Sequence, residues 1–527
     1  MLNNDKYILT IDLGTSGPKA AIISIYGEVV DYEFEPNQVF LLEGGGAEQN
    51  PTEWWEAVLK ILKKLLLRQS NYSDKIVALS CTAQWSGTVA VDKEGNHLHN
   101  AIIWLDSRGS QYANEATDGF PKVSGYGLWK LQKWLRITGG IPSKSGKDSI
   151  AHILYIKHQL PNVYRNTYKF LEPKDFLNLK LTGQFAASTD SVTLYWLTDN
   201  RDISNIRYND DLIKMSGIDK EKLPVLKSSI DIIGNIKPEI ASQLGLSNEI
   251  KVVAGSADIH SASVGSGAVR DYEGHFYIGT SSWMICHVPY KKTDILHNMA
   301  SLPSAIPGKY FVVTEQETSG ACLNFLKNNI LYHKDVLQTQ ENVRDIYKLF
   351  DKIVQDVPSG SNKVIFTPWL FGERTPVEDH TVRAAFYNLS LDTTRGHLLR
   401  AVFEGVAFNA RWLLIYLEKF IKQKFPYLHL IGGGGNSKVW SQILADVLDR
   451  PIKQVKDPIQ ANLKGAAYIA SVGLGYMKFE DIPRHIQFSE NYTPNPANRK
   501  IYDELFREFI NIYKSNKDIY RRLNKID

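Results

Sequence analysis

The sequence has few cysteines, no long apolar run and no large imbalance of charge. Its three cysteines, Cys81, Cys286 and Cys322, are widely spaced and odd in number, so they form neither a disulfide framework nor a metal-ligand pattern. No apolar run approaches the about 20 residues that span a bilayer. The 61 basic and 57 acidic side chains give a net charge of +4, which indicates neither a nucleic-acid nor a membrane partner. These absences predict a cytoplasmic protein with reduced thiols.

The length of the chain predicts two large domains. A chain of 527 residues exceeds what one ordinary core holds, and 43% hydrophobic and 22% charged residues are typical of a soluble globular protein. The first residues show no charged-then-apolar signal pattern. We expect an N-terminal domain over residues 1–250, a second domain over 251–490 and a helical extension over 491–527.

Apolar runs and turn residues predict the elements along the chain. Strands are expected over residues 7–12, 19–25, 29–34, 76–80, 87–91, 168–171, 251–255, 275–278, 283–288 and 428–431. Helices are expected over 52–69, 237–244, 319–331, 340–355, 395–424, 437–448 and 502–523, with two more on either side of strand 168–171. The mixture predicts an α/β fold.

The tripeptide Gly-Thr-Ser occurs twice, each time after a strand-like run. Glycine allows a ligand to approach the backbone, successive N–H groups form an anion-binding nest, and the hydroxyls add donors. One copy alone is typical of a surface turn, but two copies in matching contexts indicate two related domains that hold one polyphosphate between them. The predicted phosphate-binding residues are Gly14, Thr15, Ser16, Gly279, Thr280 and Ser281.

An acidic residue stands only before the first of these turns. Asp12 ends an apolar strand, where an ionised carboxylate needs a cation or a hydrogen-bond partner. Mg²⁺ bound through water would supply that partner. The alternative is a carboxylate that caps its own turn. We therefore expect Asp12 to be the metal-binding residue.

Seven segments carry a resemblance to a known family. They are residues 7–17, 48–55, 103–108, 252–258, 371–376, 400–407 and 431–446. In this order they resemble the motifs of the FGGY family of carbohydrate kinases, members of the actin/Hsp70/sugar-kinase superfamily. The resemblance covers almost the whole chain. It implies two similar actin-like (ribonuclease H-like) domains that face each other across a catalytic cleft.

The resemblance implies a catalytic role for Asp258. This residue follows an apolar strand and a Gly-Ser-Ala turn, where the family has its general base and a substrate contact. A carboxylate there can accept the proton of a sugar hydroxyl and orient its oxygen toward phosphorus. An N-cap before Ile259 is the alternative for an aspartate in such a turn. Arg374 and Glu404, in two of the other motifs, are interpreted as structural residues, an ion-paired loop anchor and a buried acid.

The nucleotide residues are implied by the same resemblance. A glycine run lets the backbone lie against a purine, which favours Gly433 and Gly434, with Ser437 at the start of the following helix. Gly320 and Asn324 are implied to face the nucleotide as well. For Asn324 an ordinary place in a helix start is nearly as good an interpretation.

The sugar residues implied are Gln84, Trp85, Ser86, Asp106 and Arg108. Polyhydroxylated ligands need hydrogen-bonding groups and an apolar surface to stack on, and these side chains offer both. Trp85 could equally be a core residue that follows its strand.

The sequence departs from the family pattern in three places. Many xylulokinases have Gln-Met-His-Gly where this chain has Trp85 and Ser86 in the middle positions, so the reach toward the sugar differs. His152 and Tyr155 stand where the family has Lys and Trp. Pro18 stands in the return strand of the first turn, where it is tolerable at a strand start.

Together these features predict an ATP- and Mg²⁺-dependent sugar kinase, most readily one for a ketopentose such as D-xylulose. Ribulose, erythritol, glycerol and gluconate stay open as substrates. A sugar-binding pseudokinase and a nucleotide-gated binding protein of the same superfamily are the alternatives of another class. The state of assembly stays open, with a homodimer among the options.

Overall fold

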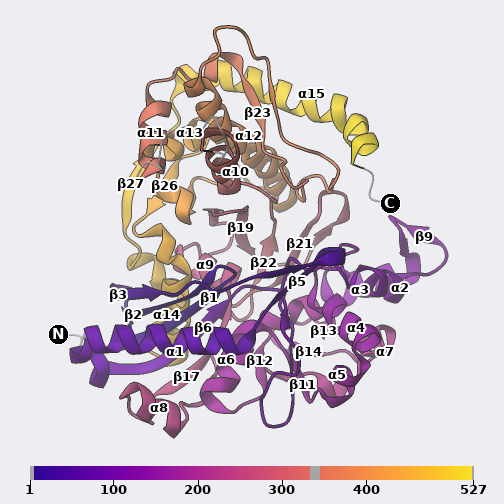
Figure 1. The fold of residues 1–527 in the computed structure, drawn as a ribbon, viewed down its shortest axis with the longest axis vertical. Coiled ribbons are helices and arrows are strands. Elements are labelled where there is room, and N and C mark those ends of the chain that lie inside the picture. The colour runs from indigo at the N-terminus through magenta and orange to yellow at the C-terminus, as the bar shows by residue number, and fades with distance from the viewer. Residues whose placement is uncertain (1–4, 333–344, 525–527) are drawn as a thin grey trace.

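The computed structural model describes residues 5–332 and 345–524. Two mixed β-sheets, one in each half of the chain, dominate the molecule, and helices cover their faces (Figure 1). In the described residues, no helix is both long enough and apolar enough to cross a membrane.

The first sheet has six strands in the order β16-β17-β6-β1-β2-β3. Strands β1, β6 and β17 are parallel to one another, and β2, β3 and β16 run against their neighbours. The strands are β1 (Tyr7–Gly14), β2 (Gly17–Ser24), β3 (Val29–Phe34), β6 (Ile76–Ala83), β16 (Ile232–Asn235) and β17 (Lys251–Ala257).

The second sheet repeats this pattern within its order β20-β21-β22-β19-β18-β25-β26-β27. Here β18, β25 and β26 are parallel, while β19, β22 and β27 are antiparallel to their neighbours. Read from β22 to β27, the strand directions match those of the first sheet from β3 to β16. The strands are β18 (Gly274–Ile278), β19 (Ser282–Val288), β20 (Thr293–Asp294), β21 (Met299–Pro303), β22 (Tyr310–Val313), β25 (Leu428–Ile431), β26 (Ile452–Val455) and β27 (Phe488–Tyr492). The predicted duplication of the α/β fold is therefore confirmed.

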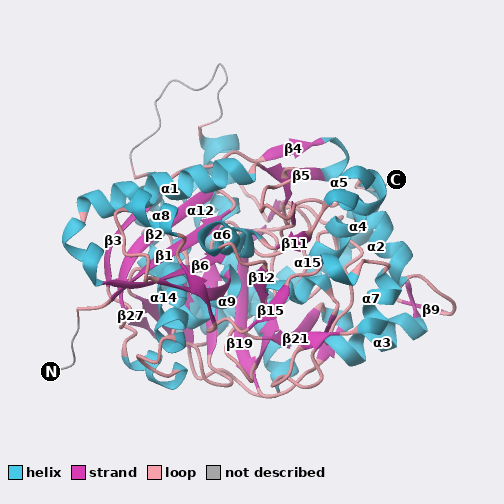
Figure 2. Cartoon of the chain, turned by 90° about the horizontal axis from the view of Figure 1, so that it is seen from below, coloured by secondary structure: helices cyan, strands magenta, loops and turns pink. Residues whose placement is uncertain are grey.

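Helices on opposite sides bury the two faces of the first sheet. Helix α1 (Pro51–Arg68) begins with Pro51 and a cap in which the Asn50 side chain accepts from the Thr52 N–H. It packs on one face, while α9 (Asp258–Gly265) and α14 (Ala461–Gly473) lie on the other (Figure 2). The two-residue period of the strands supplies both cores, since Leu9 points into the α1 core and Ile8 into the α14 core.

Long helices cover the second sheet. Helix α12 (Arg395–Ile421) begins with a capping box between Thr394 and His397 and carries the main core stripe. Helices α13 (Lys438–Leu448) and α15 (Arg499–Leu523) pack nearby, and α15 crosses the top of Figure 1. The helices expected over 395–424, 437–448 and 502–523 are confirmed within a few residues.

A third hydrophobic cluster joins the first sheet's insertions to the second half. It contains Trp134 of α3 (Leu128–Thr138), Ile150 of α4 (Ser149–Gln159) and Phe311 of β22. Apolar side chains of both halves thus share one core beside α9, whose Ile259 belongs to it.

The other described α-helices are α2 (Ser110–Thr117), α5 (Pro161–Asn166), α6 (Pro173–Thr182), α7 (Asp210–Ser216), α8 (Pro238–Leu244), α10 (Gly320–Phe325) and α11 (Ile346–Gln355). Among the short strands, β7 (Val89–Val91) pairs with β11 (Lys169–Leu171). The two helices expected around strand 168–171 correspond to α4 and α6. Of the helix expected over 340–355, residues 340–344 lie outside the described residues.

The sheet topology differs from the domain boundary expected at residue 250. Strand β17 begins at Lys251, yet it pairs with β6 inside the first sheet, and Asp258 follows it directly. A parallel strand buried between two neighbours belongs to the sheet that contains its hydrogen bonds, so β17 and α9 belong to the N-terminal half. Helix α14 also packs on β1, β6 and β17 although it lies far along the chain.

Candidate active site

Three predicted site residues lie along one edge of the first sheet. Parallel strands β1, β6 and β17 place Asp12 opposite Thr82 and Thr82 opposite Ser256. Gln84 therefore follows β6 at the same edge where Asp258 follows β17. Ligands of α/β proteins bind at the carboxyl ends of parallel strands, which makes this edge the candidate site.

Asp12 is a buried acid with one oxygen left for a ligand. Asp12 is only 2% exposed. Oδ2 lies 3.6 Å from Lys19 Nζ and accepts a hydrogen bond of 3.4 Å from Asn462 Nδ2. Oδ1 is buried and has no hydrogen-bond partner among the described residues. Burial raises the pKa of Asp12, and Lys19 partly opposes that rise.

The donor set around Asp12 suits a hydrated Mg²⁺ ion. The described part of the chain contains no group of three or more His, Cys, Asp or Glu side chains that could hold a metal. Mg²⁺ does not need such a group, because it keeps several waters and takes one or two carboxylates together with substrate phosphates. The unpartnered Oδ1 of Asp12 is the protein oxygen that fits this role.

Asp258 is the first residue of α9 and is partly exposed. Its Oδ1 accepts a hydrogen bond of 2.8 Å from the Ile259 N–H, but Ala257 and not Asp258 is the N-cap of α9, so the alternative of an N-cap is wrong. Burial of its surroundings, followed by repulsion from Asp12, raises the pKa of Asp258 to about 7. Such a carboxyl group can both take up and release a proton near neutral pH.

The first Gly-Thr-Ser turn closes a tight hairpin. Gly14 pairs with Gly17, which leaves Thr15 and Ser16 as the loop. The Thr15 hydroxyl donates to Gln84 Oε1 and accepts from Trp104 Nε1, both at 2.9 Å. Ser16 is exposed. The Thr15 hydroxyl is therefore held by protein groups, whereas the loop backbone and Ser16 are accessible to a ligand.

The second turn differs in length. Ile278 pairs with Ser282, and the intervening three residues close with a hydrogen bond of 2.9 Å from the Gly279 N–H to the Ser281 carbonyl. Thr280 is exposed. The two turns thus occupy matching places in the two sheets without being identical loops.

Electrostatics connects the second turn to the acids of the first sheet. Tyr277 precedes the turn and stacks on Trp283, with ring centroids 3.8 Å apart. Burial raises the pKa of the Tyr277 phenol, and the carboxylates of Asp258 and Asp12 raise it further. These acids influence a phenol of the other sheet, so the two halves meet at the candidate site.

The glycines predicted for the nucleotide lie against the second turn. The Gly320 N–H donates to the Gly279 carbonyl at 2.8 Å. A Cβ on Gly434 would lie 2.3 Å from Ile278 Cγ2, whereas a Cβ on Gly433 would meet nothing within 4 Å. The backbone packs closely at Gly434 and leaves open space at Gly433, as a flat ligand requires.

The other two predicted nucleotide residues have local partners. Ser437 caps α13, because its Oγ accepts from the Trp440 N–H at 3.0 Å and donates to Asp351 Oδ1 at 2.7 Å. Asn324 is exposed and accepts from the Tyr347 hydroxyl. Neither side chain is aimed at the second turn by a hydrogen bond.

The segment predicted for sugar binding is anchored to the protein at each residue. Gln84 Nε2 donates to Gln49 Oε1 at 2.7 Å, and Trp85 Nε1 donates to the Ser191 carbonyl at 2.9 Å. The Trp85 ring packs edge-on against His260, with centroids 5.3 Å apart. Trp85 is half-buried, so part of its surface stays accessible.

Asp106 and Arg108 form a closed ion-pair network with Glu48. Asp106 Oδ2 accepts from the Ala47 N–H at 2.8 Å and from Arg108 Nε at 2.9 Å. Arg108 Nη2 also donates to Glu48 Oε1 at 2.6 Å, and its guanidinium stacks on Tyr155 at 4.6 Å. This network orders the loop that contacts the first hairpin.

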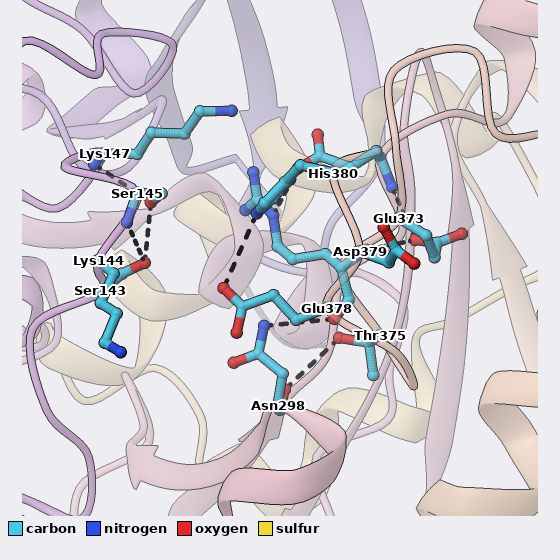
Figure 3. Close-up of polar contacts among 12 residues, drawn as sticks. Ser143, Lys144, Ser145, Lys147, Asn298, Glu373, Thr375, Glu378, Asp379 and His380 are labelled. Carbon is cyan, nitrogen blue, oxygen red and sulfur yellow. Dashed lines mark hydrogen bonds and ion pairs between the residues drawn. The ribbon is translucent and has the colours of Figure 1, made fainter. Parts of the chain in front are cut away.

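Loop 143–147 of the first half lies opposite residues 373–380 of the second half (Figure 3). The Ser86 hydroxyl donates to the Lys147 carbonyl at 2.6 Å, and Lys147 Nζ lies 5.4 Å from the centroid of the Phe371 ring. Burial lowers the pKa of Lys147, while the carboxylates of Glu317 and Glu315 oppose that shift. Loop 143–147 therefore faces charged groups of the second half.

Two residues interpreted as structural are confirmed as ion-paired. Arg374 forms ion pairs with Glu315 and with Glu317, the latter at 2.8 Å. Glu404 is buried, and its carboxylate pairs with Arg400 at 2.7 Å.

The departures from the family pattern have local explanations. His152 is buried, and burial lowers its pKa to about 4, so it is a neutral core residue near neutral pH. Tyr155 supports Arg108, as described above. Pro18 lies opposite Leu13 at the start of β2. Gly17 beside it is required, because a Cβ there would lie 2.0 Å from the Glu35 carbonyl oxygen.

Several site residues were not predicted from the sequence. Trp104 contacts the first hairpin and belongs to the motif at 103–108, so its motif was a usable signal. Lys19 follows Asp12 by seven positions, and the hairpin register places them opposite each other. Asn462 of α14 contacts Asp12, and no local sequence pattern indicates this contact.

Comparison with known proteins identifies the class to which this fold and site belong. Residues 7–265 match the model of the N-terminal domain of the FGGY family of carbohydrate kinases, and residues 275–474 match that of its C-terminal domain. The chain therefore belongs to the FGGY family of carbohydrate kinases and is a sugar kinase.

Its relatives include kinases named for different sugars. The xylulose kinase of Lactococcus lactis is 28% identical over 98% of both chains, and the gluconokinase of Bacillus subtilis is 23% identical over 98% of this chain and 97% of its own. Two crystal structures from Lactobacillus acidophilus, a gluconate kinase and a ligand-bound xylulose kinase, match with TM-scores of 0.85 and 0.84. Both structures are 24% identical to this chain, and each match covers 98% of it. The matches cover 99% of the gluconate kinase and 100% of the xylulose kinase. They establish the two-domain actin-like fold.

Proposed function

We propose that this sugar kinase transfers the γ-phosphoryl group of ATP to a hydroxyl group of a small neutral sugar, with D-xylulose as the first candidate. One observation carries the proposal. Asp258 lies at the carboxyl edge of the parallel strands with a pKa of about 7, beside the hairpin that follows Asp12.

Asp258 is proposed as the general base. A base works best when its pKa lies near the working pH, because it is then largely deprotonated and still binds a proton well. Its carboxylate would accept the proton of the attacking hydroxyl and orient the oxygen toward phosphorus, and positioning supplies much of the catalysis in phosphoryl transfer.

The two Gly-Thr-Ser turns are proposed to hold the phosphates from opposite halves. Exposed Ser16 and Thr280, with the backbone N–H groups around them, supply donors without a permanent charge. Gly320, Gly433 and Gly434 would face the nucleoside. A Mg²⁺ ion held through water by Asp12 would neutralise phosphate charge.

The charges around Asp258 favour a neutral sugar over an aldonate. Asp12 and Glu315 raise the pKa of Asp258 and Lys19 lowers it, so acids outnumber bases near the proton that must be removed. A carboxylate on the substrate would be repelled there, whereas a ketose would not. The relatives named xylulose kinase agree with this choice, while the relative named gluconokinase supplies the competing candidate.

Release of ADP should decide the substrate. We expect D-xylulose to give the highest kcat/KM in a panel with ribulose, glycerol, erythritol and gluconate, each with ATP and Mg²⁺. Asp258→Ala should lower kcat on the preferred sugar by about 10³-fold and leave the Kd of ATP within about threefold of wild type.

The matched control is Asp271→Ala, which removes an acid whose ion pair with Lys309 spans 2.9 Å. It should keep full activity. Preference for gluconate would refute the neutral-sugar assignment, and an active Asp258→Ala enzyme would refute the assignment of the base.

A further inference from the structure

The strand that leads to Asp258 contains a bulge. In the pairing of β17 with β6 the register shifts between Val253 and Ser256, so Ala254 and Gly255 leave the regular ladder. Gly255 has φ of +70°, and a Cβ there would lie 2.0 Å from the Cys81 carbonyl oxygen. A bulge of this kind changes the direction of the strand just before the residue proposed as the base.

Two side chains of α6 donate hydrogen bonds to the bulge. The Ala254 carbonyl accepts from Lys174 Nζ at 2.9 Å and from Asn178 Nδ2 at 2.8 Å. Lys174 also forms an ion pair with Asp175, and the residues of that pair are 1% and 0% exposed. Removing two charges from water is costly, so a pair buried this deeply calls for a reason beyond ordinary stability.

A second buried acid holds the residue next to Asp258. The Ala257 N–H donates to Asp190 Oδ2 at 3.0 Å, and Asp190 is fully buried. The neighbouring Ser191 carbonyl accepts the indole N–H of Trp85 at 2.9 Å. The dipeptide Asp190-Ser191 thus touches both the turn before the base and the segment predicted to bind sugar.

We propose that Asp190 is a positioning residue for Asp258, with the Lys174–Asp175 pair as its support beneath the bulge. This inference rests on the proposed role of Asp258 as the general base. The Asp190 carboxylate fixes the Ala257 amide, which fixes the direction in which α9 begins and hence where the Asp258 carboxylate points. Because Ser191 binds Trp85, the same dipeptide also fixes the sugar segment relative to Asp258.

A merely structural role for Asp190 makes different predictions. It would lower the melting temperature of a variant and leave kcat of the folded enzyme unchanged. A positioning role instead lowers kcat, because a misplacement of about 1 Å at a reacting group costs up to about 100-fold. It leaves the KM for MgATP nearly unchanged, since the phosphate turns lie on other strands.

The test compares Asp190→Ala with Asp190→Asn, measuring kcat, both KM values and the melting temperature. Alanine removes the acceptor for the Ala257 N–H, and we expect kcat to fall about 10- to 100-fold with KM for MgATP changed less than about twofold. Asparagine keeps the shape and one oxygen acceptor, so it should restore kcat to within about threefold of wild type.

A control and a second variant keep the test decisive. Asp446 is also buried and accepts a backbone N–H, that of Asn495 at 2.8 Å, but it lies on α13 in the other half. Asp446→Ala should lower the melting temperature and leave kcat unchanged. If Asp190→Ala does not fold, the double variant Lys174→Met/Asp175→Leu replaces the pair without leaving an unpaired charge, and kcat should fall about 3- to 10-fold.

Asp258→Ala in the same assays separates this inference from the proposed function. If Asp258→Ala is inactive while Asp190→Ala, or the double variant in its place, keeps wild-type kcat when folded, the positioning role is refuted and the base stands. If Asp258→Ala stays active, the base itself is refuted.

Discussion

The raised pKa that suits Asp258 to its proposed role as a base also has a cost to folding. A carboxyl group whose pKa is about 7 in the folded protein and 3.8 in the unfolded chain binds its proton more tightly when folded. The folded state is thus favoured at low pH, and this advantage is lost as pH rises from about 4 to about 7. Above pH 7 the carboxylate is ionised, and both burial and the charge of Asp12 disfavour that ionised form in the folded protein.

We therefore predict that Asp258→Asn stabilises the enzyme at pH 8. Asparagine keeps an oxygen for the Ile259 N–H and removes the charge, so the free energy of unfolding should rise by about 1–3 kcal/mol at pH 8 and by close to zero at pH 4. Denaturant unfolding without nucleotide or Mg²⁺ measures both values. An equal gain at the two pH values, or a loss at pH 8, would contradict the raised pKa.

Single residues of the site were predictable where a local motif marked them. Asp258 and the two glycine turns follow strands, Asp12 lies near the end of one, and the carboxyl ends of parallel strands gather at a sheet edge. Local pattern could not show how each hydroxyl is used. The Thr15 hydroxyl binds Gln84 and Trp104, which are remote in sequence, and only the fold brings them together.

At the scale of elements, two helices cross at glycines. A Cβ on Gly265 of α9 would lie 1.8 Å from the Ala461 carbonyl oxygen, and one on Gly465 of α14 would lie 1.8 Å from the Ser261 carbonyl oxygen. The helix backbones are in direct contact, so no side chain can be inserted at either point. Because α9 begins with Asp258, this crossing also fixes the position of the proposed base.

Gly465→Ala should therefore destabilise the protein, although the same change in an open helix stabilises it by about 1 kcal/mol. The clash with backbone must push α14 from α9, and we expect a loss of about 2–4 kcal/mol in denaturant unfolding together with a lower kcat. Ser471→Ala on the same helix is the control, because its buried hydroxyl has no hydrogen-bond partner among the described residues. A Gly465→Ala enzyme as stable as this control would disprove the tight crossing.

Helix α14 also shows which kind of element the sequence did not predict. Strongly amphipathic helices such as α1 and α15 were predicted, since a polar face makes their period visible. Helix α14 consists largely of small and apolar residues, with Gly465 among them, and most of them are buried, so it has no such stripe. Its identity as a helix depends on the two sheets and α9 that surround it.

At the scale of the whole molecule, the two halves repeat one sheet pattern but are not independent. The duplication was predictable from the paired Gly-Thr-Ser turns, whereas the boundary was not. Strand β17 looks like the start of a new unit in the sequence, yet its pairing with β6 completes the first sheet. Pairing between strands remote in sequence is decided by the assembled sheet and not by local pattern.

Helix α14 makes the N-terminal half depend on the end of the chain. One face of the first sheet, with Ile8, Ile23 and Val253, is packed against α14, so a fragment of residues 5–270 would expose that apolar face. We expect this fragment to bind a hydrophobic dye and to unfold without a cooperative transition. Joining residues 456–476 to it through a flexible linker should restore a cooperative transition, and the same segment with Leu463 and Ile469 changed to serine should not. A cooperative transition in the 5–270 fragment alone would show that the N-terminal half folds by itself, and α14 would then be a late addition and not part of its core.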